Sequence, residues 1–190
     1  INVKHCILGN YIKKNLNKII TDLDVFYSHY PRNLNISITG TNGKSTTAKI
    51  LFNILKDQKK DVRLVGNIGN AILNEKKISD KTIFVIEISS YQIGYSKNFK
   101  ANYAAILNIS PDHLERHGNL NNYVKAKFKL VKNQTNKDYA FFDIKNKYIK
   151  KFLNRNKLNS KIINVCKKSY LEEINNIKNP YFCTDGNKEN

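Results

Sequence analysis

The stretch LNISITGTNGKSTT, residues 34–47, decides the fold class of this chain. Its apolar first half is typical of a buried strand, and its glycine-rich second half leads through Gly43, Lys44 and Ser45 into a helical pattern. A strand, a glycine loop and a helix in this order present free backbone N–H groups and a lysine charge to a phosphate. The stretch therefore predicts an α/β fold with a phosphate-binding loop.

The phosphate loop is predicted to consist of seven consecutive residues, namely Gly40, Thr41, Asn42, Gly43, Lys44, Ser45 and Thr46. Lys44 would supply a positive charge, and Ser45 would hold Mg²⁺. The general pattern for such loops also has a glycine five positions before Gly43, where this chain has Ile38. Because a bare Gly-Lys-Ser is more often a surface turn, the prediction of nucleotide binding depends on the flanking strand and helix.

Short apolar runs and helical patterns continue this arrangement along the chain. The runs that indicate strands are residues 34–39, 62–65, 82–88, 103–109, 139–142 and 162–165. They do not alternate with polar residues, as expected of strands buried on both faces of a sheet. Amphipathic stripes predict helices at residues 45–56 and 120–132, and residues 11–20 allow another. These patterns predict a mainly parallel sheet flanked by helices, with ligands at the carboxyl ends of the strands.

The chain of 190 residues has 33 Lys and Arg against 15 Asp and Glu, which gives a formal charge of +18. With 41% hydrophobic residues, 11 Tyr and 9 Phe, it is long and apolar enough to close a core. Only four of the basic residues are Arg, the residue preferred for contacts with bases and phosphates, so we interpret the charge as a solvated surface and expect no nucleic-acid partner. A phosphate-loop module acting on nucleic acid remains the alternative.

The positions of the cysteines and the hydropathy of the sequence indicate the cellular compartment of the protein. Cys6, Cys166 and Cys183 lack the spacing of a disulfide framework or a zinc site. No apolar run of about 18 residues and no signal-peptide pattern is present. These features predict a cytoplasmic protein without a membrane span. Because the first residue is Ile1 rather than Met, we expect further sequence upstream.

Polar residues interrupt the chain where three predicted strands end. Glu87 follows an apolar run, and a buried carboxylate there needs a cation such as Mg²⁺ held with Ser45; the alternative is an edge strand with Glu87 facing water or a lysine. His113 would be a second metal ligand at the same edge, or else an ordinary polar loop residue. Residues 66–69, Gly-Asn-Ile-Gly, form either a simple turn or one whose amide faces the phosphates.

Lys127 occupies an unusual position on the helix predicted at residues 120–132. It falls within the apolar stripe, whereas Lys125, Lys129 and Lys132 fall roughly opposite. Desolvation favours the neutral amine, which can react with CO₂ to form a carbamate that binds a second Mg²⁺ beside His113. The alternative is that the ammonium group reaches water at the helix end while only its stem is buried.

Five motifs in this order resemble the central ATPase domain of the Mur ligase family. They are residues 40–46, 66–69, 87–92, 107–117 and 123–127. The resemblance covers residues 34–132 and implies an ATP-dependent amide ligase of peptidoglycan precursor synthesis. In this family ATP phosphorylates a substrate carboxylate, and an amine attacks the acyl phosphate to give an amide, ADP and phosphate.

The resemblance also implies roles for individual residues. Lys44 and the loop amides would hold the ATP phosphates, Ser45 and Glu87 the first Mg²⁺, and His113 with carbamylated Lys127 the second Mg²⁺. Lys44, His113 and Lys127 are thereby predicted to be catalytic. The enzyme would work by positioning and charge neutralisation, without a protein nucleophile.

Two of the motifs favour one branch of the family. The Gly-Asn-Ile-Gly turn and the Glu-x-Ser-Ser-Tyr-Gln element resemble the ligase that joins D-glutamate to UDP-N-acetylmuramoyl-L-alanine. Asn67, Ser89 and Gln92 would contact the UDP-muramoyl substrate, and a monomer is expected. The alternatives are another Mur ligase or a ligase similar to folylpolyglutamate synthase.

Domain limits follow from the same resemblance. Residues 1–33 would be the tail of a uridine-binding domain and a linker, and residues 34–185 the central ATP-binding domain. Residues 186–190 would begin an adenine-contact segment with Asn187 and Asn190, although Gly186 stands where a histidine is usual. The C-terminal domain that contacts D-glutamate would be absent, so this fragment alone is expected to bind nucleotide poorly and to be inactive.

Overall fold

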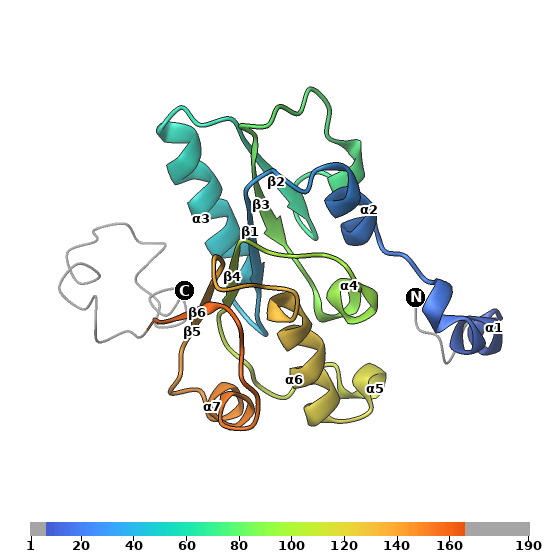
Figure 1. The fold of residues 1–190 in the computed structure, drawn as a ribbon. Helices are drawn as coiled ribbons and strands as arrows, with labels where there is room; N and C mark the ends of the chain where they lie inside the picture. The colour runs from blue at the N-terminus through green and yellow to red at the C-terminus, as the bar shows by residue number, and fades with distance from the viewer. Residues whose placement is uncertain (1–6, 166–190) are drawn as a thin grey trace.

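The computed structural model of this chain describes residues 7–165. A sheet of six strands forms its centre, in the order β2-β3-β1-β4-β5-β6 (Figure 1). The strands are β1 (Asn35–Thr39), β2 (Val62–Gly66), β3 (Ile83–Glu87), β4 (Tyr103–Ile106), β5 (Tyr139–Phe142) and β6 (Lys161–Asn164). All neighbouring strands are parallel, which confirms the predicted fold class. The predicted adenine contacts Asn187 and Asn190 lie outside the described residues.

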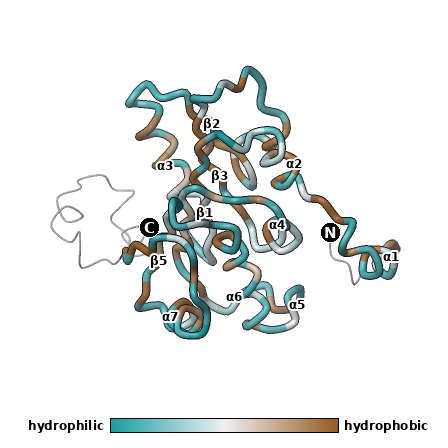
Figure 2. Tube along the Cα trace, viewed as in Figure 1, coloured by the Kyte–Doolittle hydropathy of each residue, from teal (hydrophilic) through white to brown (hydrophobic). Residues whose placement is uncertain are grey.

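Helices cover both faces of the sheet. The helices of the described residues are α1 (Gly9–Lys14), α2 (Asp22–His29), α3 (Lys44–Asp57), α4 (Ser90–Tyr95), α5 (Leu114–His117), α6 (Leu120–Phe128) and α7 (Lys147–Leu153), and α1 lies apart from the sheet (Figure 1). Helix α3 packs on one face with Ile38 and Val85, and α2, α4, α6 and α7 pack on the other face (Figure 1). Apolar residues gather along the central strands, between these two layers (Figure 2).

The register of the sheet brings three strand ends together. In β1, Ile38 is paired with Glu87 of β3, and Thr39 is paired with Ile106 of β4. The segments that follow these three strands therefore start at the same edge of the sheet. This edge is where the sequence predicted the ligand site, as expected for parallel α/β sheets.

The predicted strand ends lie within one residue of the observed ends except in β4, and β6 differs from its prediction in burial. The strand predicted at residues 103–109 ends at Ile106, because the following residues turn toward the phosphate loop, where the Asn108 carbonyl accepts a hydrogen bond from Thr41 N at 2.9 Å. The prediction that the last strand, β6, is buried on both faces is wrong. This strand is the edge of the sheet and is exposed along its length.

The single helix considered at residues 11–20 is wrong. Helix α1 ends at Lys14, and a separate 3₁₀ turn covers Leu16–Lys18. The Asn15 side chain donates to the Tyr11 carbonyl at 2.9 Å and so competes with continued helix formation. Tyr11 and Leu16 are exposed, so no packed face favours one longer helix.

Helix α2 lies before residue 34 and was not predicted from the sequence. A capping box forms between Thr21 and Asp24 at its start, which satisfies backbone N–H groups there. Leu23 and Phe26 are buried, and the Phe26 ring packs edge-on against Phe84 of β3 at 4.7 Å between centroids. Within residues 1–33, α2 is thus packed into the larger core.

Asp24 also ties α2 to the segment after α4. Its carboxylate is 5% exposed and accepts hydrogen bonds from Ser96 Oγ at 2.8 Å and from the backbone N–H groups of Lys97, Asn98 and Phe99. Burial raises the pKa of Asp24, but the hydrogen bonds together outweigh burial and lower the pKa to about 2. The ionised carboxylate is therefore a structural anchor.

Candidate functional site

The phosphate loop connects β1 to α3. Gly43 caps α3 in the left-handed conformation, with φ of 81°, which a glycine adopts without strain. Lys44 Nζ donates to the Thr41 carbonyl at 2.9 Å, and the side chain therefore lies back across the loop. A Cβ on Gly40 would lie 3.2 Å from Leu107 Cβ, so the loop backbone passes close to the segment after β4. The first turn of α3, including Ser45 and Thr46, follows directly.

Thr41 anchors the loop to two other elements. Its backbone N–H donates to the Asn108 carbonyl at 2.9 Å, and its Oγ1 accepts from Ser110 N at 3.0 Å. The Tyr123 hydroxyl of α6 lies 3.1 Å from the same Oγ1. Asn42 N also donates to the Asn108 side chain at 2.9 Å. The loop is therefore held in shape by protein contacts on the β4 and α6 sides.

Glu87 lies at the carboxyl end of β3 and is fully buried. Its Oε2 accepts a hydrogen bond from Ser45 Oγ at 2.8 Å, and its Oε1 accepts one from Asn67 Nδ2 at 3.1 Å. The predicted proximity of Ser45 and Glu87 is thus present. The edge-strand alternative is wrong, because β3 lies between β2 and β1.

Gly66 allows the end of β2 to approach Glu87. Its φ is +106°, and a Cβ at this position would lie 2.3 Å from the Glu87 carbonyl oxygen. The next residue, Asn67, donates its backbone N–H to that carbonyl at 2.9 Å. The Gly-Asn-Ile-Gly turn therefore supports the Glu87 backbone as well as its carboxylate.

Lys127 points inward from α6, as predicted, and is 2% exposed. Its Nζ donates to the Gly40 carbonyl at 2.6 Å and lies 4.6 Å from the centroid of the Tyr123 ring. The snorkelling alternative is wrong, since the ammonium group ends in the interior beside the phosphate loop. Burial is the main cause that lowers the pKa of Lys127 to about 7, and the charge of Lys44 lowers it further, while Asp112 acts in the opposite direction.

His113 is near this cluster but is more exposed, with 46% of its side chain accessible. It has φ of 51° and its ring nitrogens lie 3.3 Å from Asp112 Oδ2 and 3.8 Å from Glu115 Oε1. Its ring centroid lies 6.5 Å from that of Tyr123. Among residues 7–165, no hydrogen bond or ion pair joins His113 to Lys127 or Glu87. Tyr123 lies beside both predicted ligands of the second metal, with its ring near the His113 ring and the Lys127 Nζ.

Ser89 and Gln92, predicted to contact substrate, bind each other at the start of α4. Ser89 Oγ accepts from Gln92 N at 3.2 Å, and Gln92 Oε1 accepts from Ser89 N at 3.0 Å. This capping box stabilises the helix start that follows Glu87. Side chains of Ser89 and Gln92 that contacted a substrate would therefore also be part of the helix cap.

Sequence reasoning missed two side chains of this region. Tyr123 bridges Thr41 and Lys127, and its position one turn before Lys127 on α6 was the available signal. His117 Nε2 lies 3.0 Å from Ser90 Oγ, and its ring stacks on Tyr91 at 5.6 Å. Burial and then the charge of Arg116 lower the pKa of His117, which favours a neutral ring.

Neither a metal-ligand cluster nor a membrane-spanning helix occurs in the described part of the chain. Within residues 7–165, no three or more His, Cys, Asp or Glu side chains come close enough to hold a metal ion. In the same residues, every helix is too short or too polar to cross a membrane. A metal at the phosphate loop would therefore depend on Glu87 together with hydroxyl, phosphate or modified lysine ligands.

Comparisons with known proteins agree with this geometry. Residues 38–186 match the family model of the Mur ligase middle domain. The UDP-N-acetylmuramoylalanine–D-glutamate ligase of Rickettsia bellii is 42% identical over 139 residues, which are 72% of this chain and 30% of that protein. The ligase of the same name from Caldicellulosiruptor bescii is 40% identical over 130 residues, 68% of this chain and 28% of that protein. The chain spans less than a third of the length of these two relatives.

Solved structures share the fold. The MurF ligase from Thermotoga maritima in complex with ADP has a TM-score of 0.59 to this chain at 22% identity, over 79% of this chain and 35% of that one. A MurF from Acinetobacter baumannii has a TM-score of 0.60 at 18% identity, over 76% of this chain and 33% of that one. With the parallel sheet, the phosphate loop and the matched middle-domain model, the chain belongs to the Mur ligase family.

Proposed function

We propose that this chain is the central ATP-binding part of a UDP-N-acetylmuramoylalanine–D-glutamate ligase. The main supporting observation is that two buried ionisable side chains, Glu87 and Lys127, both contact the phosphate loop. Glu87 binds Ser45 at 2.8 Å and Lys127 binds the Gly40 carbonyl at 2.6 Å. The names of relatives that are 40% and 42% identical support the choice of amino acid and acceptor.

The phosphate loop would hold the triphosphate of ATP. Free N–H groups at the start of α3 favour an anion, and Lys44 adds a positive charge that its present contact with the Thr41 carbonyl keeps at the loop. The buried Thr39 hydroxyl, at the base of the loop, has no hydrogen-bond partner among the described residues. A polar ligand group would satisfy it.

The residues present fit Mg²⁺. Ser45 and Glu87 offer the hydroxyl and carboxylate oxygens that this ion prefers. When bound there, Mg²⁺ would neutralise charge on the ATP phosphates. We propose that His113 and a carbamylated Lys127 hold a second Mg²⁺, and that residues 34–185 form the ATP-binding domain.

Carbamylation of Lys127 is supported by burial and by its pKa of about 7. The neutral amine nitrogen attacks CO₂, an N–C bond forms, and the proton leaves to water. The product is an anion at a position where an ammonium group would repel a metal ion. Tyr123 and the Gly40 carbonyl hold the amine in place before the reaction.

The proposed reaction transfers the γ-phosphoryl group of ATP to the carboxylate of UDP-N-acetylmuramoyl-L-alanine, and D-glutamate then displaces phosphate. Lys44 and the loop amides would orient the transferring group, and Asn67, Ser89 and Gln92 would contact the UDP-muramoyl substrate. We propose that the enzyme acts in the cytoplasm, where ATP is available, and that it is a monomer.

The test is substrate-dependent release of ADP by the complete gene product that contains this chain. We expect release only when UDP-N-acetylmuramoyl-L-alanine and D-glutamate are both present, and Lys44→Ala should abolish it. Release with a different amino acid in place of D-glutamate would refute the proposed specificity. ATP hydrolysis that depends on a polynucleotide would instead support the nucleic-acid module.

A further inference from the structure

A groove between α6 and α7 lies apart from the phosphate loop. It has a volume of about 760 Å³, within the range of small-molecule sites, and is lined by residues of α6, of α7 and of the segment after α7. We call it the α6–α7 groove and define it by Val124, Lys125, Phe128, Lys151, Phe152 and Arg155. The proposed ATP chemistry uses none of these side chains.

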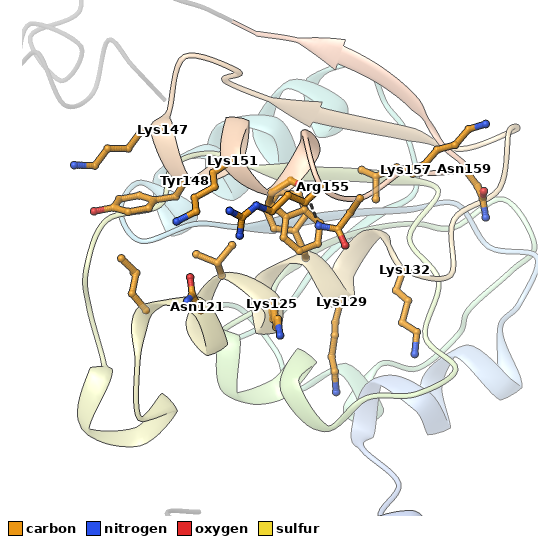
Figure 3. A pocket seen from close by; sticks show the side chains of 16 residues that line it. Asn121, Lys125, Lys129, Lys132, Lys147, Tyr148, Lys151, Arg155, Lys157 and Asn159 are labelled. Carbon is orange, nitrogen blue, oxygen red and sulfur yellow. Dashed lines mark hydrogen bonds between the residues drawn. The ribbon is translucent and has the colours of Figure 1, made fainter.

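The lining of the groove is strongly cationic. Seven of its residues are Lys or Arg, and among the described residues that line it none is Asp or Glu. Lys151 lies in α7 and Arg155 lies just after the end of this helix, and Figure 3 shows both over the space between the helices. Among residues 7–165, no acidic side chain forms an ion pair with Lys125, Lys151 or Arg155. An anion would relieve this repulsion.

Some of the cationic side chains that line the groove are directed away from it or contact other groups. Lys129 and Lys132 point away from α7, and Lys157 points away from the space between the helices (Figure 3). Lys129 Nζ also donates to the Gly94 carbonyl. Lys147 lies over the Tyr148 ring, with 5.1 Å between Nζ and the centroid. We therefore assign anion binding to Lys151 and Arg155, with Lys125 on the facing helix.

The floor of the groove is apolar and aromatic. The Phe128 ring of α6 and the Phe152 ring of α7 stack with centroids 3.7 Å apart and an interplanar angle of 15°. Val124 is buried beside them, and Leu120 and Leu158 are partly buried in the same core. Cations above an aromatic floor suit a ligand that has both a charged and an apolar part.

We propose that the α6–α7 groove binds a small organic anion in which a phosphate or similar dianionic group is joined to an apolar or aromatic part. Arg155 offers a forked donor for such a group, and Lys151 adds a second positive charge. The concave shape and the volume favour a small molecule over a protein segment. The inference does not depend on the proposed ligase activity.

The test uses 1-naphthyl phosphate as probe, with binding to the chain measured by titration calorimetry. Inorganic phosphate and 1-naphthalenemethanol represent its two parts separately. We expect the complete probe to bind at least about tenfold more tightly than either part. Equal binding of inorganic phosphate, or of the neutral alcohol, would overturn the proposal. Tighter binding of an acidic peptide would assign the groove to a protein partner and would also overturn it.

Matched variants locate the binding site. K151E/R155E should weaken probe binding at least about tenfold, whereas K145E/K150E, with the same change in charge on exposed residues outside the groove, should change it less than about twofold. Lys44→Ala should leave probe binding unchanged. Loss in the Lys44 variant, or equal loss in both double variants, would contradict the groove assignment. Thermal unfolding checks the fold of each variant, and K151Q/R155Q replaces K151E/R155E if that variant unfolds.

Discussion

The Lys127 nitrogen lies 2.6 Å from the carbonyl oxygen of Gly40, although 87 residues separate the two in sequence. This contact ties the buried face of α6 to the backbone of the phosphate loop. It also places an amine with a pKa of about 7 next to the loop that would receive ATP.

Replacement of Lys127 tests its role in the proposed reaction. In the complete gene product, Lys127→Ala should abolish ADP release, because neither the amine nor a carbamate remains. Formate or acetate should restore part of the activity, since a small carboxylate can occupy the position of a carbamate. The exposed Lys150→Ala on α7 is the matched control and should be fully active. Unchanged activity of Lys127→Ala would refute a catalytic role.

Replacement of Glu87 tests the proposed metal site. Glu87→Gln keeps the size of the side chain but removes its charge, so the gain in ATP affinity on adding Mg²⁺ should fall at least about tenfold. Binding of ATP without Mg²⁺ should change much less. Titration calorimetry with and without Mg²⁺ measures both values. Asp57→Asn, at the far end of α3, removes the same charge and should behave as wild type; an unchanged Mg²⁺ effect in Glu87→Gln would exclude this carboxylate as a ligand.

Two glycines should respond oppositely to alanine. Gly66→Ala should lower the free energy of unfolding by at least about 2 kcal/mol, because a Cβ would meet the Glu87 carbonyl oxygen at 2.3 Å and φ is +106°. Gly94→Ala should raise it by roughly 0.5 to 1 kcal/mol, because Gly94 lies in α4 with open space around it. Urea unfolding of both variants checks the pair. A stable Gly66→Ala would contradict the close approach of β2 to β3.

Asp24 should make stability depend on acidic pH. Its pKa is about 2 in the folded state against an ordinary 3.8, so between these values the unfolded chain binds more protons and stability falls as pH falls. Asp24→Asn should lose about 2 kcal/mol of unfolding free energy at pH 7. The difference from wild type should shrink as the pH drops from about 4 toward 2.

The control for this anchor lies on the same helix. Asp22 is exposed, and Asp22→Asn should leave the pH dependence of unfolding unchanged. Equal curves for the two variants would mean that the hydrogen bonds around Asp24 contribute little to stability.

Most of the sheet could be predicted because each strand is a short apolar run of its own. β5 was predicted with its observed ends at Tyr139 and Phe142. Helix α2 was not, although Thr21 and Asp24 have the spacing of a capping box, because only Leu23 and Phe26 mark its buried face. Such short helices depend on tertiary packing more than on periodicity.

The site was predicted where residues follow strand ends and missed where contacts join distant helices. The pairing of Ser45 with Glu87 follows from the parallel register of β1 and β3. The spacing of Tyr123 and Lys127 places both on one face of α6, but the hydrogen bond between Tyr123 and Thr41 depends on how α6 packs on the sheet, which that spacing does not specify. His113 also follows a strand, but its place after β4 in the sequence does not determine the direction in which its ring points.

The strand that carries the phosphate loop lies between β3 and β4, and both are synthesised after it. On the ribosome, β1 therefore emerges without either neighbour; it can pair with β3 once residue 87 has been made, and its other edge stays unpaired until residue 106 has been made. The contacts of Thr41 with Asn108 and of Gly40 with Lys127 form later still. A nascent chain halted before α6 would therefore expose the phosphate loop without the α6 contacts that hold it, and with the β5 edge of the sheet still missing.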